Sequence, residues 1–225
     1  MDHLAYQEVV LGRLPLGTAN SFARTLGIPL ALAGACDVNA YGKVADIELG
    51  RVNGDYFANM ASIGFSADVA RSTPRWLKRL IGPFAYTVIG IANFLFARKF
   101  RCDLALDGAR ETVLTHLVII ANGSFFGVAD LSPEARIDDR HLFILTMNMM
   151  SRWQLLLFWI MFILRKHRNL AEVKSFTTRQ ITIETDPPRY IDIDGEARTI
   201  RTPATISLAP EALKVMVPPG FRERH

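Results

Sequence analysis

Three turn dipeptides, each placed between apolar stretches, constrain this sequence most strongly. They are Asn-Gly at 53–54 and Asp-Gly at 107–108 and 194–195. Two-residue β-hairpin turns favour these pairs because both positions accept a positive φ at little cost. We therefore expect mainly antiparallel β structure over most of the chain. The alternating and apolar stretches predict strands at 43–52, 56–62, 101–106, 112–122, 143–147, 175–184, 189–193 and 204–208.

The first forty residues follow a different pattern. A strand is predicted at 9–16 and a helix at 21–26, with Asn20 as the N-cap and Gly27 as the C-terminal stop. A second helix is expected at 31–41. Two more helices are predicted inside the β region, near 74–97 and 151–166.

This order of elements predicts two domains. Residues 1–42 would be a partial α/β domain. Residues 43–225 would be a mainly antiparallel β-sandwich domain with inserted helices. The boundary is expected near Tyr41.

Composition fits a folded protein of the reducing cytoplasm. Half of the residues are hydrophobic and 21% are charged, which allows a sizeable core. The net charge of +4 suits an anionic partner such as a nucleotide or an acidic membrane surface. The basic residues are dispersed, so no nucleic-acid partner is expected. Cys36 and Cys102 are isolated, which predicts neither a disulfide nor a zinc site.

Two apolar stretches are poor candidates for membrane spans. Residues 155–164 number only ten, and residues 80–97 are interrupted by glycine, proline and asparagine, whereas a span needs about 20 apolar residues. Helices packed on a sheet are the favoured interpretation. Basic flanks and the nearby Trp153 and Trp159 leave peripheral membrane contact open.

Two short motifs have both a chemical and a purely structural interpretation. Gly17-Thr18-Ala19-Asn20 could bind phosphate, because glycine permits close approach and a helix N-terminus follows. It could also be a plain strand-to-helix turn. Asp194-Gly195-Glu196 would hold a carboxylate rigidly on a hairpin, as a general base requires, or would be a solvated turn.

A third motif, the acidic loop at 132–142, suits a hard cation through Asp138 and Asp139, or is an ordinary polar loop. The five histidines show no metal-binding spacing. His116 lies in an apolar strand, and we expect it to be a core residue.

Four segments occur in a characteristic order. They are LPLGTANSFAR, ADIELGRVNGDYFANMASIGFSADV, IIANGSFFGVADLSPEARIDDRHLFI and IDIDGEA. Together they resemble the bacterial lipid kinases related to diacylglycerol kinases and sphingosine kinases, from about Gly12 to Val217. The resemblance implies an N-terminal α/β domain that binds ATP, a C-terminal β-sandwich domain on the lipid side, and an active site in the cleft between them.

The resemblance also implies roles for individual residues. Thr18 would contact the nucleotide phosphates, with Gly17 and Asn20 in the same motif. Glu196 would be the catalytic base. The implied substrate is a lipid alcohol, diacylglycerol or a similar molecule, and the implied cofactors are ATP and Mg²⁺. The protein would be cytoplasmic and could lie at the membrane surface.

The same resemblance implies a structural magnesium site. Asp139 would be its carboxylate ligand, and Arg136 and His141 would supply main-chain carbonyls. Asp46 matches an acid that some members place in a magnesium–water network.

Three departures from the family pattern affect the expected activity. The Gly-Gly-Asp-Gly-Thr motif that supplies much of the nucleotide site is absent. Ser21 replaces an aspartate near the catalytic magnesium, and Arg140 replaces the glycine of the metal loop, which strains the turn. We therefore expect a truncated lipid kinase that folds but is weakly active or inactive.

Two further expectations accompany this interpretation. The alternative is a non-catalytic lipid-binding or interaction domain derived from a lipid kinase. The N-terminal segment is also expected to expose apolar surface, which leaves a homodimer open.

Overall fold

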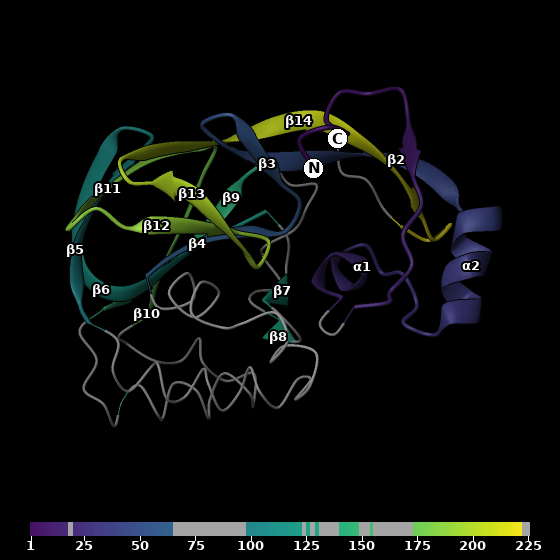
Figure 1. Ribbon diagram of the computed structural model, residues 1–225, viewed down its shortest axis with the longest axis horizontal. Helices are drawn as coiled ribbons and strands as arrows, with labels where there is room; N and C mark the ends of the chain where they lie inside the picture. Colours follow the sequence, from purple (N-terminus) through teal and green to yellow (C-terminus); the bar gives the residue numbers. More distant parts are fainter. Residues whose placement is uncertain are drawn as a thin grey trace. The chain divides into compact units, whose positions relative to one another are not determined.

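The computed structural model describes residues 1–17, 20–64, 98–122, 125–126, 129–130, 140–148, 154 and 173–221. The described chain is mostly antiparallel β structure with few helices, as the turn dipeptides predict (Figure 1). The helices predicted near 74–97 and 151–166 fall outside these ranges, except for residue 154. Within the described ranges, no helix has the length and apolar character needed to span a bilayer.

The chain forms two compact units, each assembled from separate stretches of sequence. Unit 1 contains Met1–Met60, Ala121–Leu142 and Ile206–His225. Unit 2 contains Ala61–Ile120 and Phe143–Thr205. The boundary between the two predicted domains, expected near Tyr41, stays a prediction.

Unit 1 is built on a sheet whose strands come from both ends of the chain. In spatial order they are β1 (Val10–Leu11), β14 (Ala204–Val217), β2 (Lys43–Val52) and β3 (Asp55–Phe57). β14 pairs with β2 in antiparallel register, from Ile206 opposite Val52 to Val217 opposite Lys43. β1 is parallel to β14. The short strands β7 (Phe125–Phe126) and β8 (Ala129–Asp130) form a separate antiparallel pair.

Helices α1 (Ser21–Thr25) and α2 (Leu32–Tyr41) pack on this sheet through one apolar cluster. The cluster includes Phe22, Leu26 and Val38 from the helices, together with Ile47, Leu49, Leu213 and Val215 from β2 and β14. Each of these side chains is at most 7% exposed. The burial of apolar surface therefore attaches both helices to the sheet.

The N-terminal segment also exposes apolar side chains, as the sequence predicts. The exposed large hydrophobic residues among those described are Tyr6, Val9, Val10, Leu14, Leu16, Leu30, Leu32, Tyr41, Val44 and Leu114. All but Leu114 lie in the first 44 residues. The predicted strand at 9–16 shortens to β1, because only Val10 and Leu11 pair with β14.

Both ends of α1 lie at the predicted residues, but the first of them caps the helix without its side chain. Gly27 has φ +69, and the N–H groups of Gly27 and Ile28 donate to the carbonyls of Arg24 and Ala23, which is a Schellman ending. Asn20, however, adopts a left-handed conformation with φ +50 and makes no side-chain cap hydrogen bond. Asn20 is the N-cap residue, as predicted, but its side-chain amide is engaged in the preceding turn and does not cap the helix.

Unit 2 contains the remaining strands. Their order is β13 (Glu196–Arg201), β12 (Tyr190–Ile193), β4 (Met60–Gly64), β6 (Ala109–Ala121), β5 (Phe100–Leu106) and β11 (Gln180–Asp186). β9 (Leu142–Asn148) also pairs with β6, and β10 (Val173–Thr178) pairs with β9. The isoleucines of β11 alternate with exposed residues, as expected for a sheet with one buried face.

The predicted hairpin turns are confirmed by backbone geometry. Asp194 and Gly195 both have positive φ, +50 and +81, as a type I′ turn requires. Asn53 and Gly108 also have positive φ, +55 and +81. His116 is buried at 4% exposure, in agreement with its predicted core position.

Two predicted single strands are each split in two. The stretch 56–62 becomes β3 and β4, because the chain changes pairing partners at Ala58 and Asn59. The stretch 175–184 becomes β10 and β11, separated by Arg179. The Thr178 hydroxyl donates to Asp107 Oδ2 at 2.7 Å and holds the chain where this break occurs.

Both cysteines are free thiols, and they differ in accessibility. Cys36 is exposed on α2, whereas Cys102 is buried in β5. Burial raises the pKa of the Cys102 thiol to about 12, and the neighbouring Asp103 adds to this effect. The thiolate is the reactive form of cysteine. Cys102 is therefore a packing residue.

We expect a thiol reagent at pH 8 to modify Cys36 rapidly and Cys102 only after denaturation. At this pH on the order of one Cys102 thiol in ten thousand is ionised, given a pKa near 12. Mass spectrometry of the labelled native protein checks this expectation. Cys36→Ser should abolish the fast phase, and rapid native labelling of Cys102 would contradict the burial argument.

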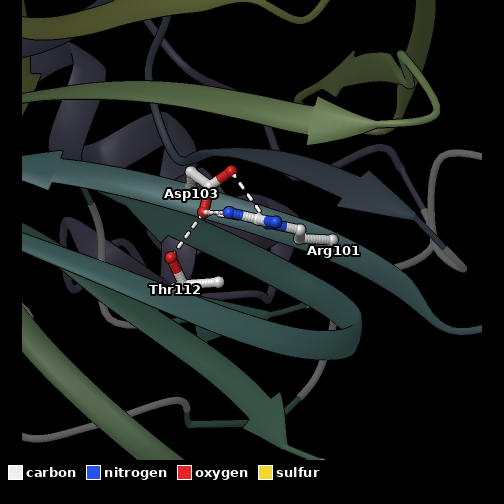
Figure 2. Close-up of polar contacts among 3 residues, drawn as sticks. All are labelled: Arg101, Asp103 and Thr112. Atoms are coloured by element: carbon white, nitrogen blue, oxygen red, sulfur yellow. Dashed lines mark hydrogen bonds and ion pairs between the residues drawn. The ribbon is translucent and has the colours of Figure 1, made fainter.

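Three polar side chains, Arg101, Asp103 and Thr112, contact one another on the β5–β6 hairpin (Figure 2). Asp103 lies opposite Thr112 in the ladder and accepts a hydrogen bond from its hydroxyl at 2.5 Å. Arg101, two residues earlier on the same face, donates from Nε to Asp103 Oδ2 at 3.2 Å. The hydrogen bond from Thr112, followed by the contact with Arg101, lowers the pKa of Asp103.

We expect Thr112→Val to raise the pKa of Asp103 toward its ordinary value of 3.8. A lowered pKa adds stability above the ordinary value, and this contribution is lost as pH falls through the folded-state pKa. The variant should therefore begin its acid destabilisation at a higher pH. NMR titration of the Asp103 carboxyl measures the shift. Thr182→Val is the control, because its hydroxyl contacts Thr205, and an equal pKa in both variants would contradict the assignment.

Candidate functional site

Glu196 occupies the position that the sequence predicts for a general base. It is the first residue of β13, directly after the Asp194-Gly195 turn, and it is exposed. Its ladder partner is Ile193, which is 2% exposed. The turn is thus accessible, while the strand that leads into it is fixed in the core of unit 2. Such an arrangement presents a carboxylate from a rigid element.

The strand behind Glu196 carries a buried acid that the sequence analysis missed. Asp192 is 5% exposed, and its Oδ2 accepts a hydrogen bond from Ser62 Oγ at 3.4 Å. The two residues are ladder partners on β12 and β4. β12 is therefore paired on both sides, with β13 and with β4, which keeps the hairpin in register.

The turn at 17–20 is shaped by Asn20. Its Oδ1 accepts the N–H of Gly17 at 2.9 Å, and its Nδ2 donates to the carbonyls of Gly17 at 2.7 Å and Pro15 at 3.1 Å. A Cβ at Gly17 would lie 3.1 Å from Asn20 Oδ1, which is tight. The described part of the turn is thus closed by one side chain. Thr18 lies outside the described residues.

The predicted metal loop is described only at its end. Arg136 and Asp139 lie outside the described residues, whereas Arg140 and His141 are described and exposed. Arg140 has φ +58, in the left-handed region that the family's glycine would adopt freely. Arg140 thus has the left-handed conformation that glycine would ease, and the strain at this position stays a prediction. Within the described ranges, no cluster of three or more His, Cys, Asp or Glu residues could hold a metal.

A buried carboxylate, Glu48, contacts this loop and was missed by the sequence analysis. Glu48 is 7% exposed on β2, and its Oε2 accepts the N–H of Arg140 at 3.1 Å. Asp46, which the resemblance singles out, is exposed on the same strand and lies opposite Lys214. Sequence alternation groups the two acids on one face, so burial of only one of them could not be predicted.

Asn122 links the main chain of Glu48 to the segment Ala58–Asn59. Its Nδ2 donates to the carbonyls of Glu48 at 2.8 Å and Ala58 at 3.1 Å, and its own N–H donates to Asn59 O at 2.9 Å. The residue is 1% exposed. The sequence offered one signal for this role: Asn122 is a polar residue that directly follows the apolar run LVIIA of β6.

The candidate residues divide between the units. Gly17, Asn20, Asp46 and His141 belong to unit 1, and Glu196 belongs to unit 2. The structure therefore provides a carboxylate presented on a hairpin and, separately, a buried acid that holds the end of an acidic loop.

Known protein families match both parts of the chain. Residues 59–217 match the YegS C-terminal NAD kinase beta sandwich-like domain, and residues 1–52 match the diacylglycerol kinase catalytic domain. The chain belongs to the bacterial diacylglycerol-kinase-like lipid kinase family. The family resemblance and the β-sandwich fold class predicted from the sequence are thus confirmed.

Relatives of this lipid kinase family extend the comparison. Diacylglycerol kinase from Staphylococcus aureus strain JH9 is 29% identical over 189 residues, which cover 83% of this chain and 59% of the relative. The same values hold for the diacylglycerol kinase of strain Newman. The chain thus spans about three fifths of the length of these relatives.

Solved structures from Bacillus anthracis str. Sterne share the fold. One, proposed to be a diacylglycerol kinase, has a TM-score of 0.81 at 22% identity, over 98% of this chain and 73% of that one. Another, a diacylglycerol kinase, has a TM-score of 0.71 at 20% identity, over 98% and 72% of the two chains.

Proposed function

We propose that this chain supplies the lipid side and the catalytic base of an ATP-dependent lipid kinase that phosphorylates diacylglycerol or a similar lipid alcohol. One observation carries the proposal: the Asp-Gly-Glu motif forms a rigid hairpin that exposes Glu196. Because the chain belongs to the lipid kinase family, we interpret this carboxylate as the catalytic base.

In the proposed reaction, Glu196 accepts the proton of the lipid hydroxyl as the hydroxyl oxygen attacks the γ-phosphorus of ATP. The new bond joins that oxygen to the γ-phosphorus, and the bond from the γ-phosphorus to the bridging oxygen breaks, so ADP leaves. Positioning and electrostatic stabilisation contribute most to such transfers. A base fixed at the start of a paired strand satisfies the positioning requirement.

The turn at 17–20 is the proposed phosphate contact, through Gly17, Thr18 and Asn20. Asn20 closes this turn through both of its amide atoms. We therefore assign Asn20 the role of shaping the turn. A residue larger than glycine at position 17 would press against it.

Magnesium is the proposed metal of the acidic loop, with Asp139 as carboxylate ligand and the carbonyls of Arg136 and His141 as helpers. Oxygen ligands of this kind suit a hard cation, which would supply local positive charge. The described end of the loop fits this role, because the Arg140 N–H is bound to Glu48 and the adjoining main chain is fixed. Asp46 remains a candidate for the surrounding water network.

The test is ATP-dependent phosphorylation of diacylglycerol in mixed micelles. Two proteins are compared: the 225-residue chain alone, and the same chain preceded by the N-terminal part of the Staphylococcus aureus diacylglycerol kinase that it does not match. We expect little turnover from the chain alone and measurable turnover from the fusion. A folded fusion without turnover would contradict the proposal.

The second candidate function is a non-catalytic lipid-binding domain. Ser21, in place of the family's aspartate at the start of α1, favours it. This candidate predicts that the chain binds diacylglycerol-containing vesicles while the fusion remains inactive. Vesicle sedimentation, run beside the turnover assay, separates the two functions and also tests peripheral membrane contact.

A further inference from the structure

Helix α2 exposes a face that is as apolar as the face it buries. Ala35 and Val38 pack into the core of unit 1, at 0% and 7% exposure. On the other side of the helix, Leu32 is 52% exposed and Tyr41 is 82% exposed. The small residues exposed between them are Ala33, Cys36 and Ala40. A helix face that stays in water normally carries charged and polar residues, so this face is suited to a partner.

The charge of this surface indicates the kind of partner. Between Ile28 and Gly42, the one charged residue is Asp37. Helices that lie on an anionic membrane surface have lysine and arginine along their polar face, and α2 has neither. A surface with so little charge suits a partner surface that is equally apolar and nearly neutral. A second copy of α2 meets this description.

The residues of α2 are also complementary to those of a second α2 that runs in the opposite direction. When the two-fold axis passes between Cys36 and Asp37, the midpoint of the helix, Ala33 of one copy lies opposite Ala40 of the other. Leu32 then comes to the same end of the pair as Tyr41 of the second copy. The alanines let the helix axes approach to about 8 Å, the close limit of helix packing. Each contact occurs twice, as in isologous dimers.

We propose that the exposed face of α2 is a self-association surface through which two copies of the chain pair in antiparallel orientation. The residues of this surface are Leu32, Ala33, Cys36, Asp37, Ala40 and Tyr41. None of them is proposed to contact phosphate, metal or the transferred proton. Self-association and kinase activity can therefore fail independently.

The size of the surface predicts a weak and reversible dimer. Leu32 and Tyr41 together expose roughly 270 Å² per copy, if a fully exposed large apolar residue presents about 200 Å². With the small residues, the pair buries on the order of 800 Å² in total, which is typical of transient interfaces. Asn39 Nδ2 donates to the Arg13 carbonyl at 3.1 Å and fixes the helix, so little further ordering accompanies pairing. We expect a dissociation constant of about 10–500 µM, which leaves Cys36 open to thiol reagents in dilute protein.

The first test determines the direction of pairing by disulfide formation in the 225-residue chain. Cys36→Ser removes the exposed native thiol and is combined with either Ala33→Cys or Ala40→Cys. On oxidation at high protein concentration, a mixture of the two double variants should give at least about fivefold more covalent dimer than either one alone. In the antiparallel pair, the two copies of position 33 lie about 10 Å apart along the helix axis, too far for a disulfide. Gly54→Cys in the Cys36→Ser background measures random collision, because position 54 is exposed on the β2–β3 turn.

The second test measures the dissociation constant by sedimentation equilibrium. Leu32→Lys should weaken the dimer at least about tenfold, because it places a charge at each end of the pair. Leu114→Lys is the matched control, because Leu114 is also an exposed leucine, at 43%, but lies on β6. It should leave the constant within about twofold of wild type. The melting temperature of dilute protein should hardly change in either variant, because neither side chain is buried.

A third variant changes the affinity in the opposite direction. In the antiparallel pair, the two copies of Asp37 face each other beside the two-fold axis, and their like charges oppose association. Asp37→Asn should therefore tighten the dimer by about threefold or more. This gain does not depend on the folding of Leu32→Lys.

Four results would overturn the proposal. They are a chain that stays monomeric at millimolar concentration, equal effects of Leu32→Lys and Leu114→Lys, and disulfides that form as readily within one double variant as in the mixture. The fourth is binding to anionic vesicles that Leu32→Lys abolishes, which would assign the face to a lipid surface. The fusion protein should dimerise as well, and a monomeric fusion would assign α2 to the added N-terminal part instead.

Discussion

If the proposed function holds, replacing Glu196 by Gln is expected to lower the turnover number of the fusion protein by about two to four powers of ten, the usual cost of a lost general base. The amide has nearly the same shape but accepts a proton poorly. Folding should be unaffected, because Glu196 is exposed at the start of β13 and the hairpin is held by β12 and β4.

The measurement is turnover of diacylglycerol by the fusion protein described above, together with its melting curve. Glu184→Gln is the matched control, because it makes the same chemical change at an exposed position of β11 in the same unit. It should retain full turnover. Activity of Glu196→Gln within a few-fold of wild type would remove Glu196 from the mechanism.

The second large effect is expected for Gly50→Ala. Gly50 faces Phe57 across the β2–β3 pair, and an added Cβ would lie 2.0 Å from the ring carbon Cζ and 2.3 Å from Cε1. The Phe57 ring is fully buried, so it can move aside only by displacing other core side chains. We expect a loss of about 3 kcal/mol of unfolding free energy, the upper part of the range for overpacked cores.

Thermal unfolding should register this loss as a fall of roughly 6–12 °C in melting temperature. Gly54→Ala is the control from the same hairpin, because nothing lies within 4 Å of its added Cβ. A second substitution, Phe57→Leu, should recover part of the loss by removing ring atoms. A Gly50→Ala protein as stable as Gly54→Ala would show that the ring moves aside freely.

Local turn chemistry allowed much of the fold to be predicted from the sequence. Asp194-Gly195 and its two companion dipeptides accept positive φ, and each joins two strands of the structure. Gly27 ended its helix for the same conformational reason. These predictions succeed because the residue type at one or two positions decides the backbone conformation.

Contacts between distant residues could not be predicted in this way. In the sequence, Gly50 is an ordinary strand glycine, and only the structure shows the Phe57 ring beside it. In the same way, the sequence suggests that Glu48 is a second surface acid beside Asp46, whereas the structure buries it. The capping rule failed at Asn20 because a left-handed backbone turns its amide toward Pro15 and Gly17. In each case the outcome depends on the tertiary surroundings.

For the candidate site, the hairpin that presents Glu196 was predicted correctly in its geometry, and the role of Glu196 stays a prediction. The burial of Asp192 in unit 2 and of Glu48 in unit 1 was not predicted, because burial of a charged side chain depends on the partners that surround it. Thr18, Arg136 and Asp139 lie outside the described residues, and their roles also stay predictions.

The position of β14 in unit 1 has a consequence for biosynthesis. β2 is complete at Val52, but its antiparallel partner β14 begins only at Ala204, after all of unit 2 except its last two residues has been made. At ribosomal rates of roughly 5–20 residues per second, that interval lasts about 7 to 30 seconds. During it, the apolar edge of β2 has only the short β3 beside it on the nascent chain. The order of the strands therefore leaves β2 without its main partner for the whole of that interval.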